Sequence, residues 1–483
     1  MKDLEPSEVW GFFEEILAIP RISRDEEKIV DYITQFAAKN KLDFKKDKTG
    51  NCLVSKPASR GFENRKPVIL QSHLDMVGEK LLDVEHDFTK DPIKAVKKEG
   101  WITAEGTTLG ADDGIGVAAS LAVLVSDSIQ HGPLECLFTV DEETGMAGAF
   151  GLEENFMQGE ILLNLDSEDE GEIFIGCAGG IETVGHFKKR TRPVQPGSRA
   201  MKLTLEGLQG GHSGDEIHKG YINAIKLMNR LLWILDREMD FHIVSFEGGN
   251  LRNAIPREAT AIIVIKENAY EQLTAGFERI VNLLGNEIKA IEPGCKMRME
   301  SGELPERCYK KKFQRKIMNM LFACPHGVIE WSPDIGGLVE TSTNLAVLKE
   351  NESGDIEVVT SQRSSRDSAK SDISDRIAAL FQLAGGEVKH SGGYPGWVPN
   401  RSSEILRISE RIYSDLFATK PKVKAIHAGL ECGLFLHTNP ELDMISFGPT
   451  IKGAHTPEEK IHIGSVDKFW KFLIALLENI PQH

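Results

Sequence analysis

The stretch Pro67-Val68-Ile69-Leu70-Gln71-Ser72-His73-Leu74-Asp75 decides how this chain folds. A short apolar run that ends in polar residues predicts a buried strand whose last residues reach the edge of a sheet. His73 and Asp75 are two residues apart, so a strand would point both side chains the same way. Helices between short buried strands indicate an α/β sheet with mostly parallel strands. Further strand-like runs occupy residues 134–140, 161–165 and 173–175, and a helical pattern occupies residues 116–124.

Acidic or histidine residues directly follow three of the predicted strands, namely as His73, Asp141-Glu142-Glu143 and Asp166. In parallel sheets ligands bind beyond the carboxyl ends of the strands, so these side chains are expected on one rim. Asp112-Asp113 at a helix entrance and His455 in a later loop complete a set of two imidazoles and several carboxylates. That set suits two divalent cations and a general base, which predicts a hydrolase.

Two glycine-rich motifs suggest other chemistry. Residues 114–119 match the G-x-G-x-x-A pattern of dinucleotide sites, but they follow a loop, and Asp112 and Asp113 would repel a pyrophosphate. Ser213 in Gly210-Gly211-His212-Ser213-Gly214 lacks the strand-to-helix elbow of a serine nucleophile. On the residues alone, His212 is either a donor to an oxyanion or a structural histidine.

The pattern of the chain changes after about residue 185. Two similar passages of strand and helix patterns follow, which suggests an internal duplication. Because His455 returns to the site that begins at His73, residues 186–390 are predicted to form an inserted α+β lid domain. Residues 1–185 and 391–483 then form the α/β catalytic domain. A chain of 483 residues is long enough to bury two cores.

Composition argues against several classes of function. The net charge of −16 disfavours nucleic-acid binding and docking on anionic membranes, because both need a basic surface. No apolar run approaches the roughly 20 residues that span a bilayer, and the first residues do not resemble a signal peptide. The seven cysteines are scattered and form no Cys-x-x-Cys pair, as expected for reduced thiols. The sequence therefore predicts a cytoplasmic protein.

Taken together, these motifs resemble the aminoacylase/carboxypeptidase-G family of co-catalytic zinc peptidases, and within it the dipeptidases that cleave Xaa-His substrates. The resemblance runs over nearly the whole length of the chain. The segments that carry it most closely begin at Gln71 (QSHLDMV), Gly106 (GTTLGAD), Gly211 (GHSG), Leu251 (LRNAIPR) and His427 (HAGLECG).

The resemblance implies a pair of divalent metal ions, zinc first, with cobalt or manganese as alternatives. Asp112 would bridge the two ions. The peptide bond between Asp112 and Asp113 would be cis. His73 and Asp166 would complete one metal site, and Glu143 and His455 the other. Glu142 would be the general base toward the attacking water, and Asp75 would orient His73.

The resemblance also implies residues that hold the substrate. His212 would reach the substrate carbonyl from the lid domain. Arg363 would pair with the substrate carboxylate, and Glu431 would hold the free amine. The oligomeric state stays open between a monomer and a homodimer, so His212 acts either within its own chain or across an interface.

Three functions are compatible with these residues. The leading one is hydrolysis of dipeptides with a free N-terminus, Xaa-His dipeptides of the carnosine kind above all. The second is deacylation of N-acyl amino acids or carboxypeptidase activity; Asp166 favours the first, because carboxypeptidase-like relatives carry glutamate there. The third is non-catalytic peptide binding, and retention of all five ligands together with Glu142 argues against it.

Overall fold

The computed structural model describes Met1 and residues 3–483 and divides the chain into two compact units. Unit 1 comprises Met1–Cys177, Trp397–Ala425 and Leu430–His483. Unit 2 comprises Ala178–Gly396 and Ile426–Gly429.

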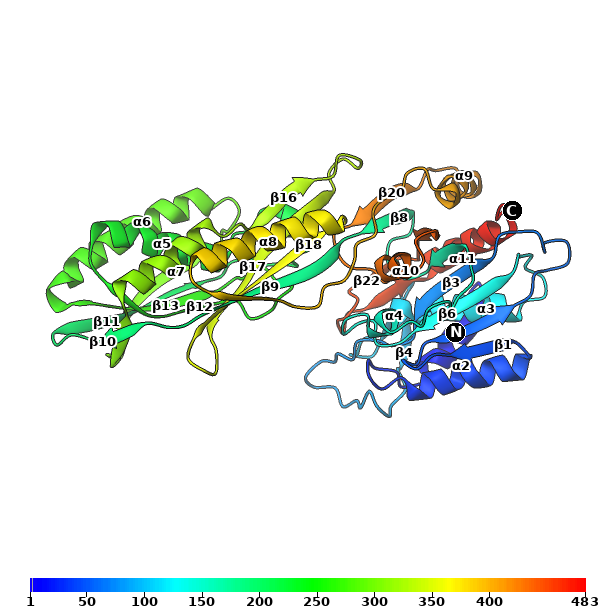
Figure 1. Cartoon of the computed structure of the whole chain (residues 1–483). Coiled ribbons are helices and arrows are strands. Elements are labelled where there is room, and N and C mark those ends of the chain that lie inside the picture. The colour runs from blue at the N-terminus through cyan, green and yellow to red at the C-terminus, as the bar shows by residue number, and fades with distance from the viewer. Residues whose placement is uncertain (2) are drawn as a thin grey trace. The chain divides into compact units, whose positions relative to one another are not determined.

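A mixed sheet forms the centre of unit 1 and has eight strands within the described part of the chain (Figure 1). In spatial order the strands are β1 (Asp43–Lys46), β2 (Cys52–Lys56), β6 (Leu134–Thr139), β3 (Val68–His73), β7 (Ile161–Asn164), β21 (Asp443–Ser446), β8 (Glu172–Cys177) and β20 (Lys422–Ile426). The four central strands β6, β3, β7 and β21 are parallel, whereas β1 pairs antiparallel with β2, β2 with β6, and β8 with β21. The α/β prediction is confirmed, and parallel pairing is confined to the centre of the sheet.

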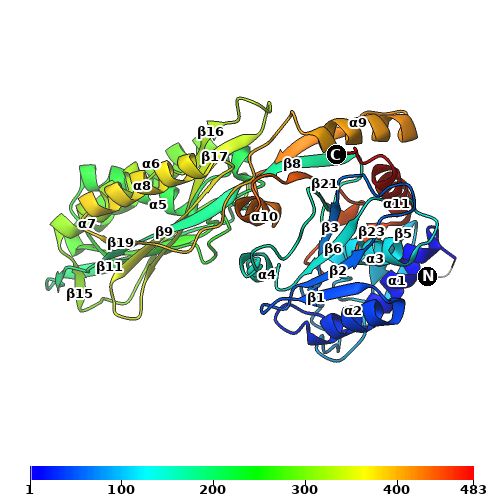
Figure 2. The same cartoon turned by 45° about the vertical axis from the view of Figure 1, so that its right-hand side comes forward.

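Helices pack against this sheet, and Figure 2 shows α2 beside β1. Every residue of β3 is buried, as expected for a parallel strand that is covered on both faces. Beyond its first turn, the helix α3 is apolar on all sides except for Ser120, and it is buried up to Leu124, between α1 and β3. The helices of unit 1 are α1 (Ser7–Leu17), α2 (Glu27–Asn40), α3 (Ala111–Val125), α4 (Ala147–Phe150), α9 (Glu404–Phe417), α10 (Cys432–Thr438) and α11 (Ile463–Glu478).

A second, smaller sheet of unit 1 carries the loop that contains His455. Its strands are β22 (Ile451–Lys452), β23 (Lys460–His462), β5 (Trp101–Ala104) and β4 (Ala95–Lys98). His455 lies between β22 and β23, which pair antiparallel with each other. The pairing of β23 with β5 joins this loop to the chain just before α3.

Unit 2 is an antiparallel sheet with helices on one face (Figure 1). In spatial order its strands are β14 (Lys296–Ser301), β11 (Ser198–Glu206), β13 (Ala259–Lys266), β12 (His242–Gly248), β17 (Val339–Glu350), β18 (Ile356–Ser364), β9 (Gly179–Phe187) and β19 (Glu387–His390), with β16 (Gly327–Trp331) also on β17. The helices are α5 (Ala224–Glu238), α6 (Tyr270–Ile288), α7 (Lys311–Ala323) and α8 (Asp367–Leu383). A short ribbon pairs β10 (Thr191–Pro193) with β15 (Arg307–Tyr309), and two 3-10 turns occupy Ile217–Lys219 and Glu267–Ala269.

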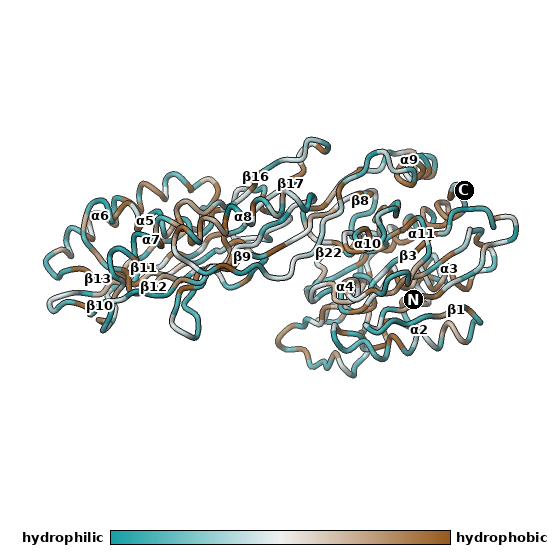
Figure 3. The backbone as a smooth tube through the Cα atoms, in the orientation of Figure 1, coloured by the Kyte–Doolittle hydropathy of each residue, from teal (hydrophilic) through white to brown (hydrophobic). Residues whose placement is uncertain are grey.

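The helices of unit 2 carry both hydrophobic and hydrophilic residues (Figure 3). The core of unit 2 forms where apolar residues of the helices, such as Leu231, meet those of the strands, such as Leu203 and Ile263. From Met201 to Glu206 the strand β11 alternates between buried residues and exposed or partly exposed ones, because helices cover only one face of the sheet. The internal duplication stays a prediction.

The division of the chain differs in detail from the predicted domain boundaries. Residue 185 lies within β9, and β9 pairs along its whole length with β18, so unit 2 begins at Ala178. At the other boundary the chain stays in unit 2 beyond residue 390, since the backbone of Tyr394 pairs with that of Gly180. Unit 2 also includes Ile426–Gly429, which the sequence did not indicate.

Candidate metal centre

Three parallel strands of unit 1 end at the same edge and bring the predicted ligands together. His73 is the last residue of β3 and is in register with Thr139, the last residue of β6. The strand β7 ends at Asn164, two residues before Asp166, and pairs in parallel with β3. The segment Asp141-Glu142-Glu143 follows β6, so its carboxylates leave the sheet beside His73.

Asp112 lies between the two histidines. Its Oδ1 is 3.2 Å from His73 Nε2, and its Oδ2 is 3.1 Å from His455 Nε2. Asp166 Oδ1 is 3.3 Å from His73 Nε2, and Glu143 Oε2 is 2.9 Å from His455 Nε2. Within the described residues, two groups that suit a metal ion therefore share Asp112: one with His73 and Asp166, the other with Glu143 and His455.

The charges of this cluster fit divalent cations. Burial raises the pKa of Asp166 well above its usual range, and the Asp112 carboxylate adds to the rise. Burial opposes ionisation of Asp112 as well, but hydrogen bonds with His455 and His73 outweigh it and lower the pKa of Asp112. Buried carboxylates this close together need a compensating positive charge. Glu143 Oε1 is buried and has no hydrogen-bond partner among the described residues, so an acceptor is left for a cation.

The donor set therefore fits two divalent cations. It consists of imidazole nitrogens and carboxylate oxygens, which zinc, cobalt and manganese all accept. Four of the five predicted ligand side chains are buried or nearly so, whereas the side chain of His455 is 50% exposed.

Asp75 contacts residues of the cluster through both of its carboxylate oxygens. Its Oδ1 accepts a hydrogen bond from the backbone N–H of Glu142 at 3.0 Å, and its Oδ2 accepts one from that of Glu143 at 3.2 Å. His73 Nδ1 lies 3.5 Å from Asp75 Oδ1. A carboxylate beside the second nitrogen of a ligating imidazole fixes the orientation of the ring. Asp75 therefore contacts both His73, a predicted ligand, and the loop that carries two glutamates.

The start of α3 is distorted where it meets the cluster. The Asp112–Asp113 peptide bond is cis, as the resemblance implies, and both residues depart from helical geometry. The backbone N–H groups of Leu109, Gly110 and Ala111 donate to the carboxylate of Glu459. A carboxylate of the protein itself thus occupies these amides, so they are not available to a phosphate group, which is a structural reason against dinucleotide binding.

Three residues that the sequence did not single out also support the cluster. Arg21 is buried, and its Nη1 donates to the backbone oxygens of Leu74 and Asp75 at 2.8 and 2.7 Å. Ser23 Oγ donates to Asp75 Oδ2 at 2.8 Å. Glu459 is the third. No local motif predicts these contacts, because each contact joins segments that are far apart in the sequence.

Glu431 lies beside the same strand ends in unit 1. Its Oε2 accepts hydrogen bonds from Gln71 Nε2 at 2.7 Å and from Thr139 Oγ1 at 2.8 Å. Burial raises the pKa of Glu431 to about 7. Its Oε1 is buried and makes no hydrogen bond to any residue that the structure describes, so this oxygen is available to a donor from a ligand.

The other two predicted substrate residues belong to unit 2. His212 Nδ1 lies 3.2 Å from the backbone nitrogen of Asp215 and 3.3 Å from Asp215 Oδ2, so its contacts within the loop leave Nε2 without a role there. Arg363 in β18 is only 8% exposed, and its Nη1 donates to the hydroxyl of Tyr394 at 2.9 Å. Its Nε is buried and unpaired within the described part of the chain.

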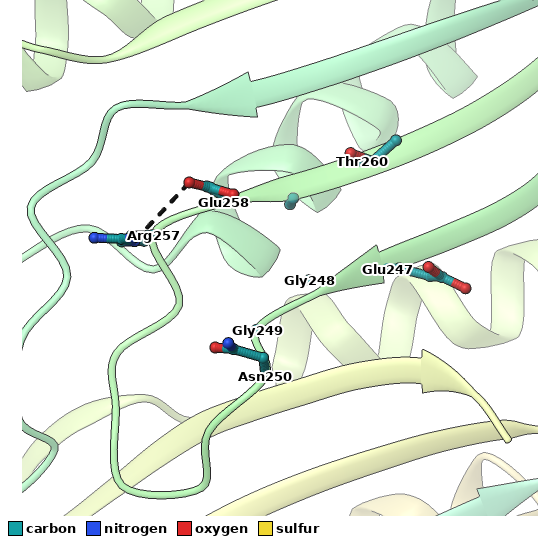
Figure 4. Close-up of a pocket in the computed structure, with 8 residues that line it drawn as sticks. Glu247, Gly248, Gly249, Asn250, Arg257, Glu258 and Thr260 are labelled. Carbon is teal, nitrogen blue, oxygen red and sulfur yellow. Dashed lines mark ion pairs between the residues drawn. The ribbon is translucent and has the colours of Figure 1, made fainter. Parts of the chain in front are cut away.

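Unit 2 also contains a polar cavity of about 320 Å³ where β12 ends and β13 begins (Figure 4). Arg257 and Glu258 face each other there, with Arg257 Nε 3.9 Å from Glu258 Oε1. Its lining includes Arg257 of the LRNAIPR segment but none of the predicted site residues. The lining residues are Glu247, Gly248, Gly249, Asn250, Arg257, Glu258, Ala259 and Thr260.

An α/β unit with imidazoles and carboxylates clustered at the carboxyl ends of its parallel strands defines a metal-dependent hydrolase. Comparison with known proteins identifies the family. Residues 69–479 match the model of peptidase family M20/M25/M40, and the chain belongs to this family. Among the described residues, no helix is long and apolar enough to cross a membrane.

Two similar proteins match the chain over its whole length. The cytosol non-specific dipeptidase of Escherichia coli is 44% identical over 481 residues, which cover 100% of this chain and 99% of that protein. The crystal structure of aminoacylhistidine dipeptidase from Vibrio alginolyticus has a TM-score of 0.91 at 44% identity and covers 100% of this chain and 98% of that one. The aminopeptidase PepT from Bacillus cereus shares the fold at 15% identity, with a TM-score of 0.57 and 99% coverage of both chains.

Proposed function

We propose that this protein is a dinuclear metallo-dipeptidase that hydrolyses dipeptides with a free N-terminus, with Xaa-His dipeptides among its substrates. The observation that carries the proposal is the position of Asp112, whose two carboxylate oxygens each face one histidine of a separate ligand group. Two relatives that match nearly the full length at 44% identity are both dipeptidases by name.

Zinc is the proposed metal, with cobalt or manganese as substitutes. His73, Asp112 and Asp166 would hold one ion, and Asp112, Glu143 and His455 the other. When bound, two such ions polarise the scissile carbonyl and lower the pKa of a nearby water. We also propose a cytoplasmic location, because the Escherichia coli relative is a cytosol dipeptidase by name.

Glu142 is the proposed general base. Its carboxylate oxygen lies within 4.8 Å of ligand atoms of His73 and Glu143, yet it is not needed to complete either group around Asp112. Burial raises the pKa of Glu142 well above its usual range, and the carboxylates of Glu431 and Glu143 add to the rise. A base of this kind takes a proton from the attacking water as its oxygen bonds to the carbonyl carbon. The same proton then passes to the leaving nitrogen as the C–N bond breaks.

Three further residues are proposed to bind the substrate. The free Oε1 of Glu431 would accept a hydrogen bond from the α-ammonium group. Arg363 would pair with the C-terminal carboxylate, since a guanidinium matches a carboxylate in bidentate geometry. His212 would donate from Nε2 to the oxyanion of the tetrahedral intermediate.

The test is hydrolysis of a dipeptide panel by the purified protein loaded with zinc, manganese or cobalt. Each dipeptide is paired with its N-acetylated form, because Glu431 is expected to require a free amine. We expect cleavage of the free dipeptides, including Xaa-His, and little cleavage of the acetylated ones. Preferential cleavage of the acetylated compounds would favour a deacylase, and activity that survives complete chelation would refute the two-metal site.

A further inference from the structure

The carboxylate of Glu459 is buried against the backbone that leads into α3. Its Oε2 accepts hydrogen bonds from the N–H groups of Leu109 at 2.8 Å and Gly110 at 2.9 Å. Its Oε1 accepts one from Ala111 at 2.7 Å and a longer one from Asp112 at 3.4 Å. The residue is 2% exposed. One carboxylate thus binds the successive amides that end at Asp112, as anions do at helix N-termini.

A buried arginine holds the same segment from another side. Arg21 Nη2 donates to the backbone oxygen of Gly110, while its Nη1 donates to those of Leu74 and Asp75. Gly110 has a φ of 72°, and a Cβ there would lie only 2.7 Å from Arg21 Nη2. The backbone before Asp112 is therefore fixed between a carboxylate and a guanidinium of opposite charge.

Glu459 also belongs to the loop of the second histidine. It follows His455 by four residues, and its backbone N–H donates to the oxygen of Thr456 at 3.0 Å. Its own backbone oxygen accepts a hydrogen bond from Thr103 Oγ1 at 2.9 Å. A shift of the Glu459 carboxylate would therefore move the His455 loop relative to Asp112, although these two ligands are 343 residues apart in the sequence.

We propose that Glu459 is a positioning residue of the metal centre, which sets Asp112 and His455 at ligand distance before a cation binds. The proposal rests on the proposed function for the identity of the centre, and it concerns metal affinity rather than contact with substrate. Outer carboxylates that orient ligands typically contribute 10–100-fold to metal affinity. Zinc should therefore bind less tightly when the Glu459 carboxylate is altered, while the substrate KM at saturating zinc stays near the wild-type value.

The test is Glu459→Gln, assayed by competition for zinc with a chromophoric chelator. Glutamine keeps the size of the side chain but turns an NH2 group toward backbone N–H donors, so accepting contacts are lost. We expect zinc affinity to fall about 10–100-fold, with activity recovering as zinc is raised and KM unchanged. Wild-type zinc affinity in a folded Glu459→Gln variant would overturn the proposal.

Glu292→Gln is the matched control. Glu292 is also 2% exposed and accepts backbone hydrogen bonds from Gln209 at 2.8 Å and Ile222 at 3.0 Å, but it lies in unit 2. It should lower the unfolding temperature and leave zinc affinity unchanged, and an equal loss of affinity in both variants would refute a specific role for Glu459. A wild-type protein that binds no zinc would instead refute the proposed function itself.

Hydrogen exchange of the wild-type protein tests the proposal without a variant, in case Glu459→Gln does not fold. Because Glu459 accepts their hydrogen bonds without help from a metal, the amides of Leu109, Gly110 and Ala111 should be protected in the metal-free protein. Protection should change little when zinc is added. Rapid exchange of these amides that stops only after zinc binds would overturn the proposal.

Discussion

Glu142 provides the sharpest test at the scale of single residues. Glu142→Gln keeps the shape of the side chain but removes the proposed proton acceptor. We expect kcat for dipeptide hydrolysis to fall about 10²–10⁴-fold, the usual contribution of a general base. Binding of the two proposed zinc ions should persist, because Glu142 is not part of either ligand group around Asp112. Steady-state kinetics and elemental analysis measure the two effects.

Asp141→Asn is the control for this variant, since Asp141 lies on the same loop and interacts with Thr144 and Arg24. It should retain most of the activity. Near-normal turnover by Glu142→Gln would refute the general-base assignment, and loss of zinc from that variant would mean that Glu142 is a ligand.

Asp75 offers a second prediction because it contacts both His73 and the loop that carries Glu142 and Glu143. In Asp75→Asn an NH2 group replaces one oxygen that accepts from the backbone of Glu142 or Glu143. We expect a loss of about 10–100-fold in zinc affinity or kcat/KM. Ser23→Ala removes only one of the hydrogen bonds to Asp75 and should have a smaller effect. Equal effects of the two variants would contradict the central role of the Asp75 carboxylate.

At the scale of elements, parallel strands explain why much of the site could be predicted from the sequence. The apolar runs before His73, Glu142 and Asp166 are local patterns, and parallel pairing places their ends together. The contacts of Arg21, Ser23 and Glu459 could not be predicted in this way, because they join segments 52 to 350 residues apart. The start of unit 2 at Ala178 could not be predicted for a related reason: the pairing of β9 with β18 is not visible in the composition of either strand.

Alanine substitutions at two helical glycines should change the stability of the protein in opposite directions. A Cβ at Gly11 in α1 meets no atom within 4 Å, whereas a Cβ at Gly116 in α3 would lie 2.3 Å from Asp113 Oδ1. Gly11→Ala should stabilise the protein by about 0.5–1 kcal/mol, because alanine favours the helix. Gly116→Ala should destabilise it by about 1–3 kcal/mol through overpacking. Urea unfolding of the metal-free protein measures both, and changes of the same sign would contradict the prediction.

At the scale of the whole molecule, metal binding should stabilise the two units unequally. All five proposed ligands belong to unit 1, whereas unit 2 has its own hydrophobic core. Zinc at 100 times its dissociation constant would stabilise the folded state of unit 1 by about 2.7 kcal/mol per site. Chelation should therefore abolish activity and speed hydrogen exchange in β3 while leaving β13 nearly unchanged. Equal acceleration in both strands would show that the units open as one.

The place of β21 in the central sheet has a consequence for synthesis on the ribosome. This strand lies between β7 and β8, yet it follows all of Ala178–Gly396 in the sequence. Domains fold as the chain leaves the ribosome, N-terminal part first. Unit 2 can therefore assemble around its own core while the sheet of unit 1 still lacks β21. The nascent chain then already carries Glu142 but lacks His455. The proposed metal centre can therefore form only after residue 455 has been translated.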